Sequence, residues 1–464
     1  MFFSPLAKKW RYMYSVLRGC LPLEIFMIKE RCMKKGMLFT LILLVCFGSA
    51  FGGPKAESDS GGKESLTVWV TSDSPEMRAQ LEKFKGQNPD IDFSIVFYPS
   101  EDLKTQLRLA VDSKTTPDIF YVNAGTMFQD FYRTGALADL TDIVRQNNLL
   151  SHINPDYIKP YTIDGKYYAF PGAPLTVWMA LYVNRDIFAQ AGITKDPATY
   201  SELLQTAAKL RSAGVAPLAI GDKDGWPAIL LMGDFFAQQV TNMSIINAIN
   251  SGRDKFTTNR EIRRAFETVV NLGKAGVFMN GFVSQDHTAG IQTFAAGRAA
   301  MLYNGSWWTG VAGGTDFGFK LDVITLPLLD GLTEGRSVQM SSDMAYAVNP
   351  ASIQKASVAK FLNYASSEES SIISAQGISA FAIYPGANEK VKLDPVFRTQ
   401  PILSQFSKPS LAPFFDWVFP TPVTEILKVA IQQTIQGTIT VDQALVQLQA
   451  EMDKNLNTMS PIAE

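Results

Sequence analysis

Tryptophans that stand beside carboxylate and amide side chains are the residues of this sequence best suited to recognising a small ligand. Beyond residue 52 the chain has six tryptophans, and four of them are predicted to lie in loops, where a buried core indole is less expected: Trp69, Trp226, Trp307 and Trp308. A sugar ring stacks its apolar C–H face on flat aromatic groups, while Asp, Glu, Asn and Ser bind its hydroxyls. The complete set of predicted ligand-binding positions is Trp69, Ser72, Asp73, Glu101, Asn123, Gly125, Trp178, Trp226, Asn304, Trp307, Trp308 and Asp343.

Few residues of the chain could perform covalent or metal chemistry. Beyond the leader the only histidines are His152 and His287, and the second of these is predicted to be solvated. There is no HExxH, GxSxG or Walker pattern, so neither a catalytic residue, a metal site nor a cofactor is expected. A glycoside hydrolase stays open as an alternative, because such enzymes also combine aromatic platforms with a carboxylate pair.

The first group of elements that must position these residues follows a βαβαβ pattern. From Leu66 the stretch LTVWVT predicts a strand, and Ser74-Pro75-Glu76 predicts a helix start, because it combines a cap, a proline and an acid. A strand in IDFSIVF, a helix from Ser100 and a strand in PDIFYV follow. Right-handed crossovers would make this sheet parallel, and ligands of such sheets bind beyond the carboxyl ends of strands. Those ends are residues 69–73, 99–102 and 123–126.

A second group of strands and helices begins with TVWMALYVN, a predicted strand with Trp178 near its start. Glycines are expected to end the helices that follow, at Gly192, Gly214 and Gly297. The loop DKDGWPA presents Trp226 just before an apolar helix. Later, a short strand is predicted to lead into the loop that carries Asn304 and Trp307.

Residues 1–65 are predicted to lie outside the folded part of the chain. Lys34 and Lys35 precede an apolar run over 37–47 and small residues around Ala50, which fits a signal peptide over 33–52. Residues 1–32 are then an upstream extension, and 53–65 a flexible tether. The apolar run is short for a bilayer span, so an uncleaved anchor is the less favoured alternative.

The cysteines and the charge point to an acidic protein without disulfides. Cys20, Cys32 and Cys46 all lie in the leader, which excludes disulfide and thiolate chemistry from the rest of the chain. Lipidation of Cys46 is a minority alternative, because Val45 replaces the usual small residue before it. The whole chain carries a charge of −2, and residues 1–52 hold eight basic and two acidic residues, so the remaining 412 residues carry −8. This charge disfavours nucleic acid and anionic membranes as partners, and the length favours two lobes.

Several of these stretches resemble the extracellular solute-binding proteins of ABC importers, family 1, which bind sugars and release them to a membrane permease. They are LYVNRDIFAQAGITKDPATYSELLQTAAKLRSAGVAPLAIG from Leu181, TPDIFYVNAGTMFQDFYRTGALADLTDIV, FAAGRAAMLYNGSWW and TIQGTITVDQALVQLQAEMDKNL. The family's tryptophan at the position of Trp307 commonly contacts sugar. Two departures are Tyr182-Val183 in place of an aromatic pair, and EGRSVQMSSDMAYAVNP, which leaves the contacts of Asp343 and Met344 open.

The resemblance implies an α/β, two-lobed periplasmic-binding-protein fold of type II, in which each lobe is a mostly parallel sheet flanked by helices. Residues 66–172 with 317–349 are expected to form the N-terminal lobe, and 173–316 with 350–460 the C-terminal lobe. Crossing strands near Pro171 to Pro174 and Asn349-Pro350 would act as a hinge. An extracytoplasmic, monomeric protein would then capture a sugar by closure and deliver it to its permease.

Binding of another solute is a further alternative. Some relatives carry ferric iron with clustered tyrosines, and Tyr167-Tyr168 is such a pair, although IDGKYYAFP reads better as a hairpin leading into the hinge. Polyols, glycerol phosphates and oligosaccharides are not separated by the sequence. The acidic or neutral character of the site loops favours a neutral sugar.

Overall fold

The computed structural model describes residues 63–71, 75–153, 157–172, 177–309, 312, 315–341, 345–378, 382–391 and 411–462. The predicted leader and most of the tether lie outside these residues, as do three predicted site positions, Ser72, Asp73 and Asp343. Among the described helices, none has the length and apolar character needed to cross a membrane.

The first sheet has five strands in the order β2-β1-β3-β12-β6. They are β1 Glu64–Thr71, β2 Ile91–Tyr98, β3 Ile119–Val122, β6 Phe170–Pro171 and β12 Ala345–Val348. Strand β1 pairs in parallel with β2 along its whole length and with β3 on its other edge, whereas β12 runs antiparallel to both β3 and β6. The predicted βαβαβ pattern is therefore confirmed, and an antiparallel strand from much later in the chain completes the sheet.

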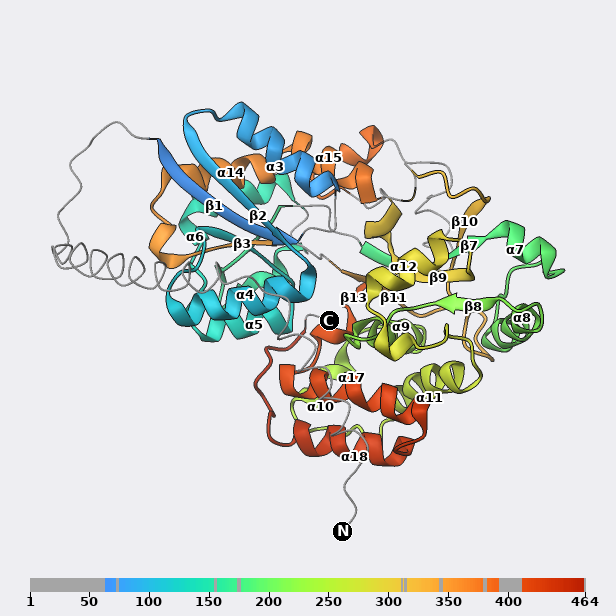
Figure 1. Ribbon diagram of the computed structural model, residues 1–464. Coiled ribbons are helices and arrows are strands. Elements are labelled where there is room, and N and C mark those ends of the chain that lie inside the picture. The colour runs from blue at the N-terminus through green and yellow to red at the C-terminus, as the bar shows by residue number, and fades with distance from the viewer. Residues whose placement is uncertain are drawn as a thin grey trace, which may run out of the picture. The chain divides into compact units, whose positions relative to one another are not determined.

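Helices α3 Pro75–Gln87 and α4 Ser100–Ser113 connect the parallel strands and lie on opposite faces of the first sheet (Figure 1). Two right-handed crossovers that proceed in opposite directions across a sheet require this arrangement. Further helices of the first lobe are α5 Thr126–Arg133, α6 Thr141–Gln146, α14 Ala356–Ala365 and α15 Glu368–Ile378. Both α14 and α15 pack against α3.

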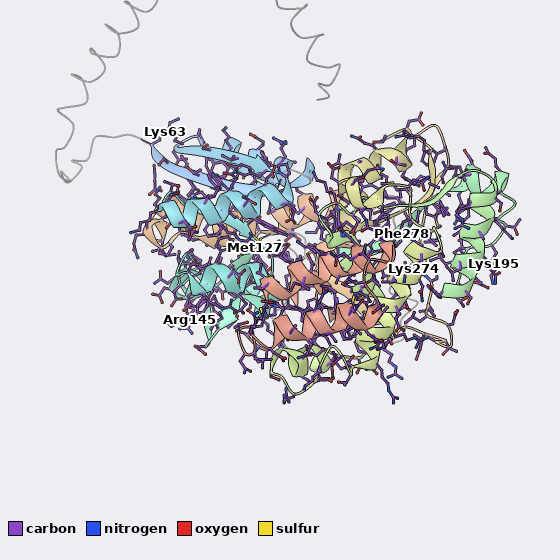
Figure 2. All side chains as sticks on the ribbon, turned by 60° about the horizontal axis from the view of Figure 1, so that its bottom comes forward. Lys63, Met127, Arg145, Lys195, Lys274 and Phe278 are labelled. Carbon is purple, nitrogen blue, oxygen red and sulfur yellow. The ribbon has the colours of Figure 1, made fainter. Side chains whose placement is uncertain are left out.

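The second sheet is ordered β13-β11-β7-β9-β8, and β10 also pairs with β7. Its strands are β7 Val177–Asn184, β8 Ala216–Ala219, β9 Ala299–Gly305, β10 Leu321–Ile324, β11 Val338–Ser341 and β13 Leu411–Ala412. Its helices are α7 Arg185–Gln190, α8 Tyr200–Ser212, α9 Trp226–Ala237, α10 Ser244–Asn250, α11 Arg260–Lys274, α12 His287–Ala295, α17 Thr421–Gln436 and α18 Val441–Met452. Figure 2 shows α17 and α18 running side by side. Antiparallel pairing of β9, β10 and β11 with β7 makes this sheet mixed rather than mostly parallel.

The segment around Asn184 shows why its sequence is distinctive. Asn184 ends β7 and caps α7, because its Oδ1 accepts hydrogen bonds from the backbone amides of Asp186 and Ile187. The guanidinium of Arg185 pairs with Asp196 and also donates to Asp322 of β10, 2.7 Å away. These bonds hold β10 and the loop before α8 to the end of β7.

The hairpin predicted for IDGKYYAFP is present. Strands β4 Thr162–Ile163 and β5 Lys166–Tyr167 pair antiparallel across a turn in which Gly165 has a φ of 74°. The ring of Tyr168 packs against that of Tyr132, with centroids 4.8 Å apart. Tyr167 and Tyr168, the pair considered for iron binding, therefore both lie in or beside this hairpin.

The division of the chain between the lobes differs from the predicted one. Strands β10 and β11 were assigned to the N-terminal lobe, but both pair with β7 of the second sheet. Helices α14 and α15 were assigned to the C-terminal lobe, but both pack against α3 of the first. Hydrophobic periodicity predicts where a helix or strand lies in the sequence, but not which sheet it joins. These elements were therefore assigned to the wrong lobe.

The predicted hinge at Asn349-Pro350 is also misplaced. The chain passes from β11 in the second sheet to β12 in the first between Ser341 and Ala345. Asn349 lies within the first lobe, because its backbone amide and its Nδ2 donate to the carbonyls of Asp118 and Thr116, each at 2.9 Å. The other predicted hinge, at Pro171 to Pro174, begins where β6 of the first sheet ends, before β7 of the second.

A buried carboxylate in the second lobe predicts how stability depends on pH. Burial raises the pKa of Asp234 from 3.8 to about 7, against hydrogen bonds from Tyr303 and Gln339. The folded chain then holds this proton more tightly than the unfolded chain between these values, so stability is lost as the pH rises through about 7. We expect the unfolding midpoint to rise as the pH falls from about 8 to about 5.5, by about 2 °C for each kcal/mol gained.

The variant that isolates this effect is Asp234→Asn. It should raise the midpoint at pH 8 and flatten its dependence on pH, because the amide stays neutral at every pH. Thermal unfolding by circular dichroism across this range checks the expectation. A wild-type midpoint that falls on acidification to pH 5.5 would contradict it.

Candidate ligand-binding site

Five aromatic side chains from separate parts of the second lobe form a connected cluster. The ring of Trp226 lies 4.6 Å from that of His287 and 6.3 Å from that of Trp307, centroid to centroid. The Trp307 ring meets Phe414 edge-on at 6.1 Å, and Phe414 meets Trp417 at 4.9 Å. Trp226, His287 and Trp307 are only partly buried, so their rings offer apolar surface to a ligand.

Glycines set the orientation of this aromatic cluster. Trp226 is the first residue of α9, and Gly225 before it turns the chain with a φ of 76°. Trp307 lies in the 3₁₀ turn Ser306–Trp308 directly after β9. A Cβ atom on Gly305 would lie 2.1 Å from the Trp307 ring, so that ring rests directly on the backbone of Gly305.

Asn304 adds a polar side-chain amide to the aromatic cluster. Its Oδ1 accepts a hydrogen bond from the backbone amide of Gly305 at 2.8 Å, and it faces Nε2 of His287 at 3.0 Å. Because both contacts involve Oδ1, the amide group of the side chain has one orientation, and Nε2 of His287 is the donor. Nδ2 of Asn304 is buried without a hydrogen-bond partner among the described residues, in a side chain that is 1% exposed. His287 was predicted to be solvated, and the structure instead holds it between Asn304 and Trp226.

Two of the predicted tryptophans belong to the core. Trp178 is 1% exposed and lies inside β7, and Trp308 is 4% exposed and packs edge-on against Tyr182 at 4.8 Å. The prediction that Trp308 lies in an accessible loop is therefore wrong, because its ring fills a hydrophobic cluster with Phe294 and Phe317. Trp69 is not in a loop either, since it lies within β1, partly buried beside Tyr98 at 5.2 Å.

The first lobe approaches this region through α4 and α5. The Glu101 carboxylate pairs with Lys104 one turn later on α4, at 2.8 Å. Asn123 follows β3 and is 5% exposed, with its Nδ2 donating to the hydroxyl of Tyr121. Gly125 precedes α5 with a φ of 72°, and a Cβ there would lie 2.3 Å from the carbonyl oxygen of Trp417.

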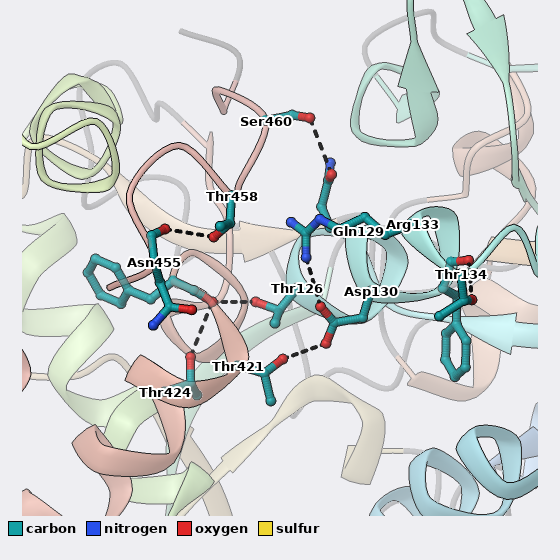
Figure 3. A network of polar contacts seen from close by, with 12 residues as sticks. Thr126, Gln129, Asp130, Arg133, Thr134, Thr421, Thr424, Asn455, Thr458 and Ser460 are labelled. Atoms are coloured by element: carbon teal, nitrogen blue, oxygen red, sulfur yellow. Dashed lines mark hydrogen bonds and ion pairs between the residues drawn. The ribbon is translucent and has the colours of Figure 1, made fainter. Parts of the chain in front are cut away.

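Polar contacts continue from Gly125 along α5 to the last part of the chain (Figure 3). The Thr126 hydroxyl lies 2.9 Å and 2.7 Å from the carbonyl oxygens of Trp417 and Phe419. Thr421 donates at 2.5 Å to Asp130, which lies one turn after Thr126 on α5, and Ser460 donates to Gln129 at 3.2 Å. A helix of the first lobe is therefore bonded to two segments of the second.

Four charged side chains meet beside the aromatic cluster: Glu101, Lys104, Asp416 and Lys428. Burial raises the pKa of Asp416 to about 6, although Lys104 and Lys428 both favour its ionised form. Burial would also raise the pKa of Glu101, but Lys104, Lys428 and Arg108 outweigh it and keep that pKa below its usual value.

The segment 411–420 is the part of the site that the sequence did not predict. Phe414, Asp416 and Trp417 come from it, and it contacts both α9 of the second lobe and α5 of the first. The stretch APFFDWVFPTP carries a signal that could have found it, namely an aromatic run with a carboxylate between prolines. Its place next to Trp307 depends on the pairing of β13 with β11, which no local pattern shows.

The chain has two α/β lobes, with aromatic and polar side chains in the region where the lobes contact each other. This arrangement is typical of a solute-binding protein of the periplasmic type. Residues 79–404 match the model of the bacterial extracellular solute-binding protein family, and the chain belongs to that family. The resemblance stated from the sequence, and the two-lobed α/β fold that it implied, are thereby confirmed.

Individual relatives are distant. An uncharacterized ABC transporter extracellular-binding protein of Pyrococcus horikoshii is 26% identical over 53% of this chain and 56% of its own length. A maltotriose-binding protein of Pyrococcus abyssi is 24% identical over 57% of this chain and 54% of its own. The chain thus spans about half the length of these two curated relatives. A chitin oligosaccharide binding protein of known structure superimposes with a TM-score of 0.74, covering 85% of this chain and 99% of that one at 19% identity.

Proposed function

We propose that this chain is the substrate-binding component of an ABC importer and that it captures a neutral sugar or oligosaccharide between its lobes. The proposal rests on one observation, namely that Trp226 and Trp307 lie beside the buried side-chain amide of Asn304. Aromatic faces cover the apolar side of a sugar ring, and an amide donor binds a hydroxyl at its edge. Trp69 and Glu101 of the first lobe are the proposed contacts from the opposite side.

The two lysines beside the aromatic cluster are each accompanied by a carboxylate, which favours a ligand without net charge. Lys104 and Lys428 face Glu101 and Asp416, so each of these two lysines has a carboxylate nearby, and Arg108 is the further cation that acts on Glu101. This argues against glycerol phosphates. The known ligands of relatives agree with a sugar, since the Pyrococcus abyssi protein is named for maltotriose and the structural neighbour for chitin oligosaccharides.

The proposed mechanism is closure of two lobes on the ligand. The bonds between α5 and residues 417–421 keep the lobes in contact on one side, so that motion elsewhere would open and close the site. An extracytoplasmic location follows from the family, and export through the predicted signal peptide at 33–52 belongs to the proposal. So do delivery to a membrane permease and a monomeric state.

One observation favours hydrolysis as the second candidate. The charge of Glu101 acts on Asp416, and the pKa values of the two carboxyls are displaced in opposite directions, as in an acid and nucleophile pair. The matching family consists of binding proteins, however, and lysines accompany both carboxylates. We therefore place binding without catalysis first.

Thermal unfolding with a panel of sugars tests the proposal. Residues 53–464 would be unfolded with and without maltotriose, diacetylchitobiose, xylotriose, glucose and glycerol 3-phosphate. A ligand that binds only the native state stabilises it by about 2.7 kcal/mol at 100 times its Kd. We expect at least one neutral sugar to raise the midpoint and to be recovered intact.

Each other result rejects part of the proposal. Recovery of a cleaved sugar would favour the hydrolase, and a rise with glycerol 3-phosphate alone would reject a neutral ligand. No rise with any sugar of the panel would reject sugar capture by this chain.

A further inference from the structure

Asp416 is the carboxylate that stands within the aromatic part of the site. It lies in the 3₁₀ turn Phe415–Trp417, one residue before Trp417 and two after Phe414, and Phe414 touches the Trp307 ring. Its charge also acts on Tyr303, the residue before Asn304 in β9. Asp416 therefore lies near the end of β9, on the side of Tyr303, although it belongs to a segment far away in the sequence.

The hydrogen bonding of Asp416 sets it apart from the other buried carboxylates of the second lobe. Asp234 accepts from Tyr303 and Gln339, and Asp222 accepts from the amide of Ala228 and from Gln432. Oδ1 of Asp416, in contrast, is buried and has no hydrogen-bond partner among the described residues. Buried acceptors in proteins are nearly always bonded, so an unsatisfied one beside a binding site calls for a donor.

A second buried polar atom of the site has no hydrogen-bond partner among the described residues, namely the donor Nδ2 of Asn304 near the end of β9. A sugar hydroxyl both donates and accepts a hydrogen bond. A sugar with several hydroxyls carries groups that can satisfy either atom, whereas a ligand with only acceptors or only donors could satisfy at most one of them.

We propose that Asp416 is a specificity-determining residue of this site, whose Oδ1 accepts a hydrogen bond from a hydroxyl group of the sugar. The inference rests on the proposed function and adds the chemical group that the site selects. A sugar whose hydroxyl at this position is methylated or removed is excluded, because the carboxylate would remain buried and unpaired.

The charged neighbours of Asp416 make the bond sensitive to pH. Those that face it are Lys104 and Glu101 on α4, Lys428 on α17 and Tyr303 on β9. Burial raises the pKa of its carboxyl to about 6 in the protein without sugar. A hydroxyl that donates to the ionised form lowers this pKa in the complex, so affinity must increase as the pH rises through about 6.

The test measures the Kd of maltotriose, diacetylchitobiose and xylotriose by calorimetry, for the wild type and two variants, between pH 5 and pH 7.5. For any sugar that binds, Asp416→Asn should weaken binding about tenfold at pH 7.5, because a neutral amide replaces a charge-assisted acceptor. The wild type should itself lose about tenfold between pH 7.5 and pH 5, and Asp416→Asn should lose much less.

The matched control is Asp234→Asn, which neutralises another buried carboxylate of the same lobe whose oxygens are both bonded to protein. It should change stability but keep the affinity and pH dependence of the wild type. If Asp416→Asn binds as tightly as the wild type, with the same dependence on pH, the inference is overturned while sugar binding stands. If none of the three sugars binds the wild type, the proposed function fails and this inference fails with it.

Discussion

Replacement of Trp307 by alanine is expected to weaken sugar binding by about 100-fold while the protein stays folded. Aromatic side chains at the centre of a binding site commonly contribute 2–4 kcal/mol, or about 30- to 1,000-fold in Kd. Trp307 is only partly buried and rests on the backbone of Gly305, so its removal takes away the platform and leaves β9 in place. Calorimetry with the sugar that stabilises the wild type most measures the loss, and circular dichroism measures the fold.

The adjacent tryptophan provides the control. Trp308 has the same chemistry but lies in the core against Tyr182, so Trp308→Phe should lower the unfolding midpoint and leave the Kd nearly unchanged. Trp307→Phe should retain part of the affinity, because a smaller ring still covers part of the sugar. A folded Trp307→Ala variant with wild-type affinity would place the sugar elsewhere.

Replacement of Gly125 by alanine should be among the most destabilising single-methyl changes in the chain. The residue has a φ of 72° and a ψ of −126°, a backbone conformation that costs other residues about 1–3 kcal/mol. The added Cβ would also lie 2.3 Å from the carbonyl oxygen and 2.8 Å from the Cβ of Trp417. Overpacking of this kind costs a further 1–3 kcal/mol, so we expect a total loss of about 2–6 kcal/mol.

Gly135 provides a comparison without the steric clash. It has the same φ of 72°, but a Cβ there meets nothing within 4 Å. Gly135→Ala should therefore report the strain of a positive φ alone, and the excess loss in Gly125→Ala should report its ψ of −126° together with the contact between α5 and residue 417. Denaturant unfolding of both variants gives the comparison. Equal losses would mean that the approach of Trp417 to Gly125 contributes nothing to stability.

The sequence was sufficient for features that depend on neighbouring residues. The βαβαβ order, the end of β7 at Asn184 and the helix ends at Gly192, Gly214 and Gly297 were predicted from periodicity and from capping, and each is present. The cap at Asn184 is an example, because its side chain bonds amides only two and three residues away. Interactions of this kind need no knowledge of the rest of the fold.

Features set by distant contacts were predicted poorly. Trp307 and Trp308 are adjacent and identical, yet one rests on Gly305 beside Trp226 and the other lies in the core. The 3₁₀ turn and the packing of Trp308 against Tyr182 determine this difference. Asp416 and Trp417 belong to the site only because a segment more than 100 residues after β9 packs against Trp307. Which sheet receives β10, β11 or β12 is likewise decided by partners far away in the sequence.

The position of β12 has a consequence for the order in which the protein is completed during synthesis. This strand lies between β3 and β6, so a ribosome that has finished residues 63–344 has made every other strand of the first sheet but not the one that joins them. Helices α14 and α15, which cover α3, emerge later still. Such non-local pairing slows folding. The first lobe, although it begins the folded part of the chain, is therefore among the last parts that can reach its final structure, and a fragment ending before Ala345 should not fold.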